Sequence, residues 1–314
     1  MDHGILPDHA ASPAPPAGLR PDIRKALAPL EAALCEIVLP GEGPSRGRFA
    51  LAYSGGMDSR FLAHAAHLLG FIPQLLMAVG PQLPPEERAF GEGWAQRNRL
   101  PLRQVEVDPL RLPLVARNDR RRCYECKRAL FHRLLETLCQ EGPHAPLPLC
   151  DGTNASDALA YRPGTQAVQE LGVLSPLALA GLSKPDIYRL AALTGMERPD
   201  QKPRPCLLTR LPYGMEPKRE VLEALAAGEQ AVRRALARAA LPEADFRLRL
   251  VPNEKKTCTL ELHLLKSEAE TLPQALADEL TALLAEAAPA LPRPVRLVPQ
   301  DTLSGFFDRL ADNT

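Results

Sequence analysis

Two cysteines separated by two residues stand among basic residues in the stretch RRRCYECKRALF, from Arg120 to Phe131. Thiolates bind iron and zinc, act as nucleophiles and form redox couples, so Cys123 and Cys126 alone leave several kinds of site open. Cys206 follows about eighty residues downstream in KPRPCLLTR. Three thiolates around one site suit a [4Fe–4S] cluster with one iron left without a protein ligand, because full ligation takes four cysteines.

The alternatives for the cysteine pair are a zinc site and a redox couple. Structural zinc takes four ligands, usually with a second close pair, which the remaining cysteines do not form. A redox CxxC is typical of a thioredoxin-like unit. The basic residues around the pair favour a solvated surface; if they face the site, they would lower thiolate pKa values and attract anions. They are Arg120, Arg121, Arg122, Lys127 and Arg128. We interpret four further cysteines as core or strand residues: Cys35, Cys139, Cys150 and Cys258.

A glycine-rich loop, YSGGMDS, follows a short apolar run and precedes a segment of helical spacing. At the carboxyl end of a strand, two glycines and a helix N-terminus direct backbone N–H groups toward a phosphate. The loop lacks the Gly-Lys-Ser/Thr of a Walker A motif. The carboxylate of Asp58 beside a phosphate indicates either a ligand of Mg²⁺ or a residue that hydrogen-bonds such a ligand. The alternative is a glycine turn with an N-capping serine. We expect the phosphates of ATP to contact Ser54, Gly55, Gly56, Asp58 and Ser59.

Further polar residues are candidates for substrate binding. Asp151 and Asn154 follow the fourth expected strand at the carboxyl edge of the sheet, where each could also form a turn. Arg162 in YRPG offers a planar fork for phosphate or carboxylate, unless it bonds backbone carbonyls. Thr209 and Arg210, close behind the third cysteine, could orient a phosphate, with a helix or turn cap as the alternative for Thr209.

The elements that must position these residues alternate between strand and helix. Buried strands are indicated by RFALAYS, IPQLLMAV, LRQVEVD and APLPLC, and helices by SRFLAHAAHLLG, PPEERAFGEGWAQRNR and the segment from about Lys127 to Gln140. This alternation predicts an α/β fold with a doubly wound, mostly parallel sheet covered on both faces.

The alternation stops near RLPYGMEP, and a smaller α+β domain is predicted to follow. It contains a long Ala-rich helix, the strands DFRLRLV and TCTLELHL with one wet face, helices from Ser267 to about Ala288 and the strand PVRLVPQ. Arg247 and Arg249 project from the same face of the first of these strands, where they could bind phosphate or simply be solvated. We therefore predict a disordered tail at 1–22, an α/β domain at 23–213 and an α+β domain at 214–314.

Composition limits the partners of the protein. The 38 basic and 38 acidic residues give a formal net charge of zero, so no global basic field recruits nucleic acid or an anionic membrane. No segment has the apolar run of a signal peptide or the length of a membrane span. We expect a cytoplasmic protein with reduced cysteines and without membrane or nucleic-acid partners.

The loop YSGGMDS resembles the SGGxDS loop of the PP-loop ATP pyrophosphatases, which adenylylate a substrate oxygen and release pyrophosphate from ATP. Together with RCYECK, DGTN, YRPG and TRLPYG in this order, it makes the chain similar to the LarE family of ATP-dependent sulfur transferases in nickel-pincer nucleotide biosynthesis. The resemblance is dense from about residue 48 to 215. It implies a homo-oligomer such as a hexamer, with ATP and Mg²⁺ as cofactors. It further implies that the carboxylates of pyridinium-3,5-biscarboxylic acid mononucleotide are adenylylated and converted to thiocarboxylates.

Cys206 falls at the sulfur-donor position of this family. In members with that cysteine alone, it attacks the acyl adenylate and gives up its sulfur, which leaves dehydroalanine. In a subset, three cysteines hold a [4Fe–4S] cluster whose free iron carries a hydrosulfide, and we favour this version because Cys123 and Cys126 are otherwise hard to explain. Glu229 and Glu261 match family positions at a metal and phosphate site between subunits, whereas Val251 replaces a usual histidine.

Other functions explain the residues less completely. PP-loop tRNA 2-thiolation also has cluster-dependent members with three cysteines, but it predicts a basic surface and additional zinc modules. PP-loop amidation leaves the cysteines without a role, and a non-catalytic nucleotide-binding module would not need Cys206.

Overall fold

The computed structural model of the protein describes residues 19–38, 46–140, 146–159, 163–202, 205–241, 244–254, 257–270 and 272–312. The expected tail at 1–22 lies outside these ranges except for its last residues, which lead into the first helix. The chain divides into two compact units, neither of them a single stretch. The first comprises residues 1–79, 88–107 and 127–203, and the second 80–87, 108–126 and 204–314. The expected division at residue 213 stays a prediction.

The first unit is built on a four-stranded parallel sheet, which confirms the predicted α/β fold. Its order is β3-β2-β1-β4, and Leu51 of β1 lies opposite Leu75 of β2 and Cys150 of β4. The strands are β1 (Arg48–Ala52), β2 (Ile72–Val79), β3 (Leu102–Glu106) and β4 (Leu149–Cys150). The helices are α1 (Pro21–Ile37), α2 (Met57–Leu68), α3 (Pro85–Arg97), α5 (Arg122–Cys139), η2 (Ala155–Leu159), α6 (Pro163–Glu170), α7 (Pro176–Leu179) and α8 (Lys184–Leu193). The first turns of α3 and α5 belong to the second unit.

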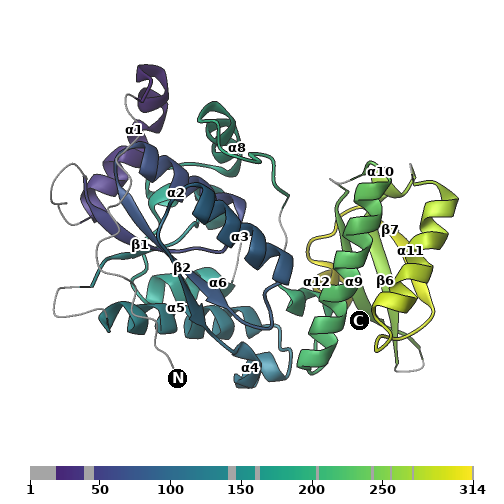
Figure 1. The fold of residues 1–314 in the computed structure, drawn as a ribbon. Coiled ribbons are helices and arrows are strands. Elements are labelled where there is room, and N and C mark those ends of the chain that lie inside the picture. The colour runs from purple at the N-terminus through teal and green to yellow at the C-terminus, as the bar shows by residue number, and fades with distance from the viewer. Residues whose placement is uncertain are drawn as a thin grey trace. The chain divides into compact units, whose positions relative to one another are not determined.

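Helices cover both faces of this sheet, as the doubly wound pattern predicts. Figure 1 shows α2 and α3 on one side of the strands and α5 and α6 on the other. Ala50 of β1 packs with Leu134 of α5 and Val168 of α6. Because successive strand residues point to opposite faces, Phe49 and Leu51 point toward the helices on the other face of the sheet, and both are fully buried.

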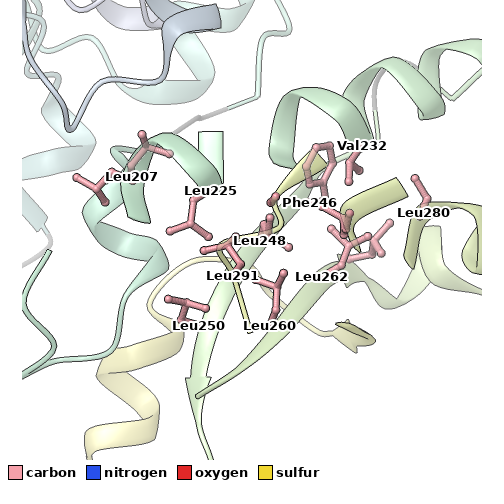
Figure 2. Packing of buried hydrophobic residues seen from close by; sticks show 14 of the residues in the cluster. Leu207, Leu225, Val232, Phe246, Leu248, Leu250, Leu260, Leu262, Leu280 and Leu291 are labelled. Atoms are coloured by element: carbon pink, nitrogen blue, oxygen red, sulfur yellow. The ribbon is translucent and has the colours of Figure 1, made fainter. Parts of the chain in front are cut away.

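The second unit contains a three-stranded sheet of order β5-β6-β7, in which β5 and β6 are antiparallel and β6 and β7 parallel. The strands are β5 (Phe246–Pro252), β6 (Cys258–Leu265) and β7 (Val295–Gln300). The helices are η1 (Pro109–Arg111), α4 (Pro113–Ala116), η3 (Leu207–Arg210), α9 (Arg219–Arg238), α10 (Lys266–Ala269), α11 (Gln274–Ala287) and α12 (Phe306–Asp312). Leu248 and Leu262 of the sheet pack with Val232 of α9 and Leu280 of α11, as Figure 2 shows.

The opposite face of β5 and β6 is buried at Arg247, Arg249 and His263 and half-buried at Glu261, whereas the alternating pattern predicted a wet face. Arg247, Arg249 and His263 are 4%, 3% and 0% exposed. The C-terminal segment covers part of this face: the Leu303 carbonyl accepts a hydrogen bond from Arg249 Nη2, and the guanidinium lies 4.9 Å from the centre of the Phe306 ring. The two arginines on β5 are therefore not explained as solvated residues of an exposed strand face.

Helix α5 begins at Arg122, about one turn before the expected start at Lys127. Asp119 accounts for the earlier start, because its Oδ1 accepts a hydrogen bond from the Arg121 N–H at 2.8 Å and its carbonyl accepts one from the Arg122 N–H at 2.9 Å. Cys123 and Cys126 consequently lie on a helix and share one of its faces. None of the described helices has the length and apolarity needed to cross a membrane.

Candidate functional site

The glycine-rich loop joins β1 to α2 in the first unit, as predicted. Gly55 has φ +73°, a conformation that favours glycine, and Gly56 is the N-cap of α2. The Ser54 hydroxyl accepts a hydrogen bond from the Gly56 N–H at 3.3 Å and lies 3.2 Å from the Ser59 hydroxyl. This arrangement gathers hydroxyl groups and helix N-terminal N–H groups, which suits an anion.

Asp58 in the first turn of α2 forms an ion pair with Lys184, which the sequence analysis did not identify as a site residue. Lys184 Nζ lies 2.7 Å from both Asp58 carboxylate oxygens, and both side chains are about one quarter exposed. Lys184 is the first residue of α8, which begins with a capping box formed by Ser183 and Asp186. Although the loop lacks a Walker lysine, α8 supplies an ammonium group to the same place.

The DGTN segment that follows β4 packs directly on the start of α2. A Cβ atom at Gly152 would stand 2.9 Å from the Ser59 backbone nitrogen, so this position has no space for a side chain. The Asp151 carboxylate accepts hydrogen bonds from the hydroxyls of Thr153 and Ser175 at 2.5 and 2.7 Å. Asn154 Oδ1 accepts one from the Ser156 N–H at 2.9 Å.

These bonds make Asp151 and Asn154 organisers of the loop, which is the turn-forming role considered above. Their contact with a substrate stays a prediction. Arg162, the third residue expected near this edge, lies outside the described residues.

The three cysteines of interest belong to the second unit. Cys123 is exposed, and Cys126 and Cys206 are half-buried against the same hydrophobic core. Asn118 joins their two segments, because its buried side-chain nitrogen donates to the carbonyls of Leu211 and Pro212 at 3.3 and 2.7 Å. Segments distant in sequence are thus held together, as the three-cysteine hypothesis requires.

The charges around Cys206 act in opposite directions on its thiol. Burial raises the pKa of Cys206, and the neighbouring Cys123 raises it further. The Leu208 N–H and the positive charges of Arg122 and Arg210 lower it. The pKa of the Cys206 thiol is therefore set by burial against the influence of one other thiol and two guanidinium groups.

A hydrogen-bonded chain connects Cys206 to the arginine-bearing strand. The Thr209 hydroxyl donates to the Cys206 carbonyl at 2.8 Å and accepts from Arg210 Nη1 at 2.8 Å. Arg210 Nε and Nη2 donate to the two oxygens of Glu229 at 2.6 and 3.1 Å, and Glu229 Oε1 also accepts from the Leu248 N–H at 3.0 Å. Burial opposes ionisation of Glu229, but the charge and hydrogen bonds of Arg210 hold its pKa below the usual value.

Arg249 contacts uncharged hydrogen-bond partners, the His263 ring and the Leu303 carbonyl. Its Nη1 lies 2.8 Å from His263 Nδ1, and His263 Nε2 lies 2.8 Å from Glu261 Oε2. Burial, followed by the charges of Arg210 and Arg247, lowers the pKa of Arg249 to about 9. Arg210 and Arg247 on this face are paired with Glu229 and Asp245, whereas Arg249 hydrogen-bonds only the Leu303 carbonyl and the His263 ring among the described residues.

No three His, Cys, Asp or Glu side chains are grouped closely enough to hold a metal ion in the part of the chain that the structure describes. The three carboxylates expected to hold a cation each contact a basic side chain instead: Asp58 contacts Lys184, Glu229 contacts Arg210 and Glu261 contacts His263. The three thiols match an iron–sulfur cluster in donor type and number, and all three are free of disulfide bonds.

Comparison with known proteins gives three informative relatives, whereas no protein-family model matches the chain. An uncharacterized protein of Synechocystis sp. is 35% identical over 188 residues, which cover 60% of this chain and 69% of the relative. An uncharacterized protein of Methanocaldococcus jannaschii is 29% identical over 171 residues, covering 54% of this chain and 63% of the relative. The pyridinium-3,5-bisthiocarboxylic acid mononucleotide synthase of Lactiplantibacillus plantarum is 28% identical over 170 residues, covering 53% and 60%.

Proposed function

This chain belongs to the same family as the Synechocystis protein and is a distant homologue of the Lactiplantibacillus synthase, and on this basis we propose a function for it. The proposed function is that of an ATP-dependent sulfur transferase in nickel-pincer nucleotide biosynthesis. The relationship supports the LarE family. The substrate we propose is pyridinium-3,5-biscarboxylic acid mononucleotide, whose carboxylates become thiocarboxylates. The observation that carries the proposal is the packing of Cys126 and Cys206 against the same hydrophobic core in a chain that also has a PP-loop.

The first half of the reaction is activation of a carboxylate by ATP. The N-terminus of α2 with Ser54 and Ser59 offers donors to the phosphates, and Lys184 offers a positive charge. Asp58 would hold Mg²⁺ through its carboxylate after exchange of its lysine partner. Attack of the substrate carboxylate on the α-phosphorus forms the acyl adenylate and releases pyrophosphate, and sulfur then displaces AMP.

The second half is delivery of sulfur. We propose that Cys123, Cys126 and Cys206 hold a [4Fe–4S] cluster, which when bound would supply an iron position open to sulfide. Thr209 and Arg210 fix the backbone at Cys206 through their hydrogen bonds to its carbonyl and to Glu229. Arg247 and Arg249 are proposed to bind the phosphate of the substrate, and Glu229 and Glu261 to hold a divalent cation.

The alternative source of sulfur is Cys206 itself. Its thiolate would displace AMP from the acyl adenylate to form a thioester. Elimination across the Cα–Cβ bond would then release the thiocarboxylate and leave dehydroalanine at position 206. This route consumes the chain after one transfer.

Iron analysis distinguishes the two routes. Protein purified without oxygen should be brown and contain about four irons and inorganic sulfide per chain. Replacing Cys123, Cys126 or Cys206 by Ala should remove them, whereas Cys258→Ala, a half-buried cysteine of the same unit, should not. A colourless protein whose Cys206 loses the elements of H₂S in the presence of ATP and substrate would refute the cluster.

The substrate class has its own test. Release of AMP should depend on the pyridinium bis-acid nucleotide. Release that depends on tRNA instead would refute the assignment to cofactor biosynthesis and favour 2-thiolation.

A further inference from the structure

Arg122 is a buried cation next to the cysteine pair, and no carboxylate of the described residues forms an ion pair with it. Its residue is 4% exposed, in contrast to the exposed Arg120 and Arg121 before it. Its Nε and Nη1 atoms have no hydrogen-bond acceptor among the described residues. Buried charges in proteins are normally paired and hydrogen-bonded, so two unsatisfied donors on one guanidinium indicate a missing anion.

The surroundings of Arg122 supply only a partial substitute. The guanidinium carbon lies 4.6 Å from the centre of the Tyr213 ring, a distance at which the ring attracts a cation. The carboxylate of Asp308 accepts a hydrogen bond from the Tyr213 hydroxyl at 2.5 Å, but it accepts none from Arg122 Nε or Nη1. Glu229 is committed to Arg210. Arg122 is thus positioned but left with free donors.

The position of Arg122 defines where a bound anion would lie. Arg122 precedes Cys123 at the start of α5, where the helix N-terminus adds partial positive charge. Its contact with the Tyr213 ring and the hydrogen bonds of Asn118 to Leu211 and Pro212 hold the start of α5 to the segment that follows Cys206. Any anion bound by Arg122 therefore lies beside the sulfur-transfer cysteines.

We propose that Arg122 binds a carboxylate group of the substrate beside Cys206. The assignment rests on the proposed function, because the acyl group that receives sulfur must come to this cysteine. A pyridinium bis-carboxylate has a second carboxylate that stays anionic while the first is activated, and planar guanidinium and carboxylate groups match in shape. Arg122 would orient the ring by this second group and select dicarboxylic over monocarboxylic substrates.

Alkylation of Cys206 tests the assignment without ATP, metal or substrate. Iodoacetate and iodoacetamide deliver groups of similar size to a thiolate, but only iodoacetate carries a carboxylate. The ratio of their rates at Cys206, measured by peptide mass spectrometry on the full chain with reduced thiols, cancels changes in thiolate population or access. We expect Arg122→Gln to lower the iodoacetate preference about tenfold, equivalent to about 1.4 kcal/mol. Arg122→Lys should lower it less, and the exposed neighbour variant Arg121→Gln should leave it unchanged.

A protection experiment completes the test. Pyridine-3,5-dicarboxylate should slow the reaction of Cys206 with iodoacetamide in the unmodified chain and in Arg121→Gln, but not in Arg122→Gln. The proposal is refuted if the rate ratio is the same in all variants of retained helix content. Equal protection by inorganic phosphate would overturn the assignment to a carboxylate. A chain that makes thiocarboxylates yet shows an unchanged ratio would refute the role of Arg122 alone, whereas an inactive chain with the expected ratio would refute the proposed function alone.

Discussion

Replacing Glu229 by Ala should be one of the most destabilising single substitutions in the second unit. Arg210 is 2% exposed and donates to both carboxylate oxygens, and the Leu248 N–H donates to one of them. Removing the carboxylate leaves a buried guanidinium whose neighbours Arg247 and Arg249 are also positive. Loss of one partner of a buried ion pair costs about 3–5 kcal/mol, and we expect a loss in this range. Glu229→Gln retains an acceptor for Leu248 and should cost about 2–3 kcal/mol, since an uncompensated charge remains.

Urea unfolding followed by circular dichroism measures this loss. Glu279→Gln is the matched control, because Glu279 also forms an ion pair with an arginine of the second unit, Arg238 on α9, but both of these side chains are more than half exposed. The control should change the free energy of unfolding by less than about 0.5 kcal/mol. Trp94 is the only tryptophan of the chain and lies in the first unit, so its fluorescence reports separately on that unit. A loss below about 1 kcal/mol in Glu229→Ala would refute the reasoning.

The same pair predicts a dependence on pH. The pKa of Glu229 is lower in the folded than in the unfolded chain, so its contribution is complete above the usual carboxyl pKa of about 4.3. The contribution is lost as the pH falls through the folded pKa. The stability difference between the unmodified chain and Glu229→Gln should therefore shrink on acidification below about pH 4, and a constant difference would contradict this assignment.

Three further predictions concern other parts of the structure. Lys184→Met should weaken ATP binding about tenfold or more in calorimetry with helix content unchanged, because the Asp58 carboxylate then faces the phosphates without its neutralising ammonium; unchanged affinity would exclude Lys184 from the nucleotide site. Gly228→Ala should lower stability by about 1 kcal/mol in urea unfolding, because the new Cβ would stand 2.7 Å from Leu248 Cδ2 and overpacking exceeds the gain in helix propensity; a stabilised variant would show that the core yields at this point. Burial lowers the pKa of His64 to about 4, so the unfolded chain binds a proton that the folded chain excludes, and stability should fall between about pH 6.5 and 4. His64→Gln should reduce the loss of stability at acidic pH, measured by unfolding followed through Trp94 fluorescence. An unaltered pH dependence would argue against a buried neutral His64.

Much of the first unit could be predicted because its signals are local. IPQLLMAV coincides with β2 as predicted, since a continuous apolar run is what a strand buried on both faces requires. Ser54 to Ser59 were located by the same logic, from two glycines between a strand and a helix. The start of α5 was missed because NDRRRC has no apolar periodicity, although Asp119 is a turn-forming residue type and its side chain accepts a hydrogen bond from the Arg121 N–H just before the helix.

Contacts between distant segments could not be predicted. Lys184 reaches Asp58 across 126 positions, and nothing in either local sequence specifies the pair. The shared face of Arg247 and Arg249 followed from the two-residue period of a strand, but their burial depends on Leu303 and Phe306, which lie more than fifty residues away. Periodicity therefore predicts direction, whereas burial depends on what the chain later brings to that face.

The packing of Gly152 on Ser59 has a consequence for how the protein is made. The two residues lie nearly one hundred positions apart, and β4, which carries Gly152 to the loop, pairs with β1 through only two residues. Parallel pairing over such a separation must overcome a large loop-closure entropy and forms late in folding. A nascent chain that has emerged only to about residue 140 thus contains the whole YSGGMDS motif without its packing partner. On the proposed function, we expect nucleotide binding to begin only after synthesis has passed Lys184, so that the unfinished chain would not bind ATP.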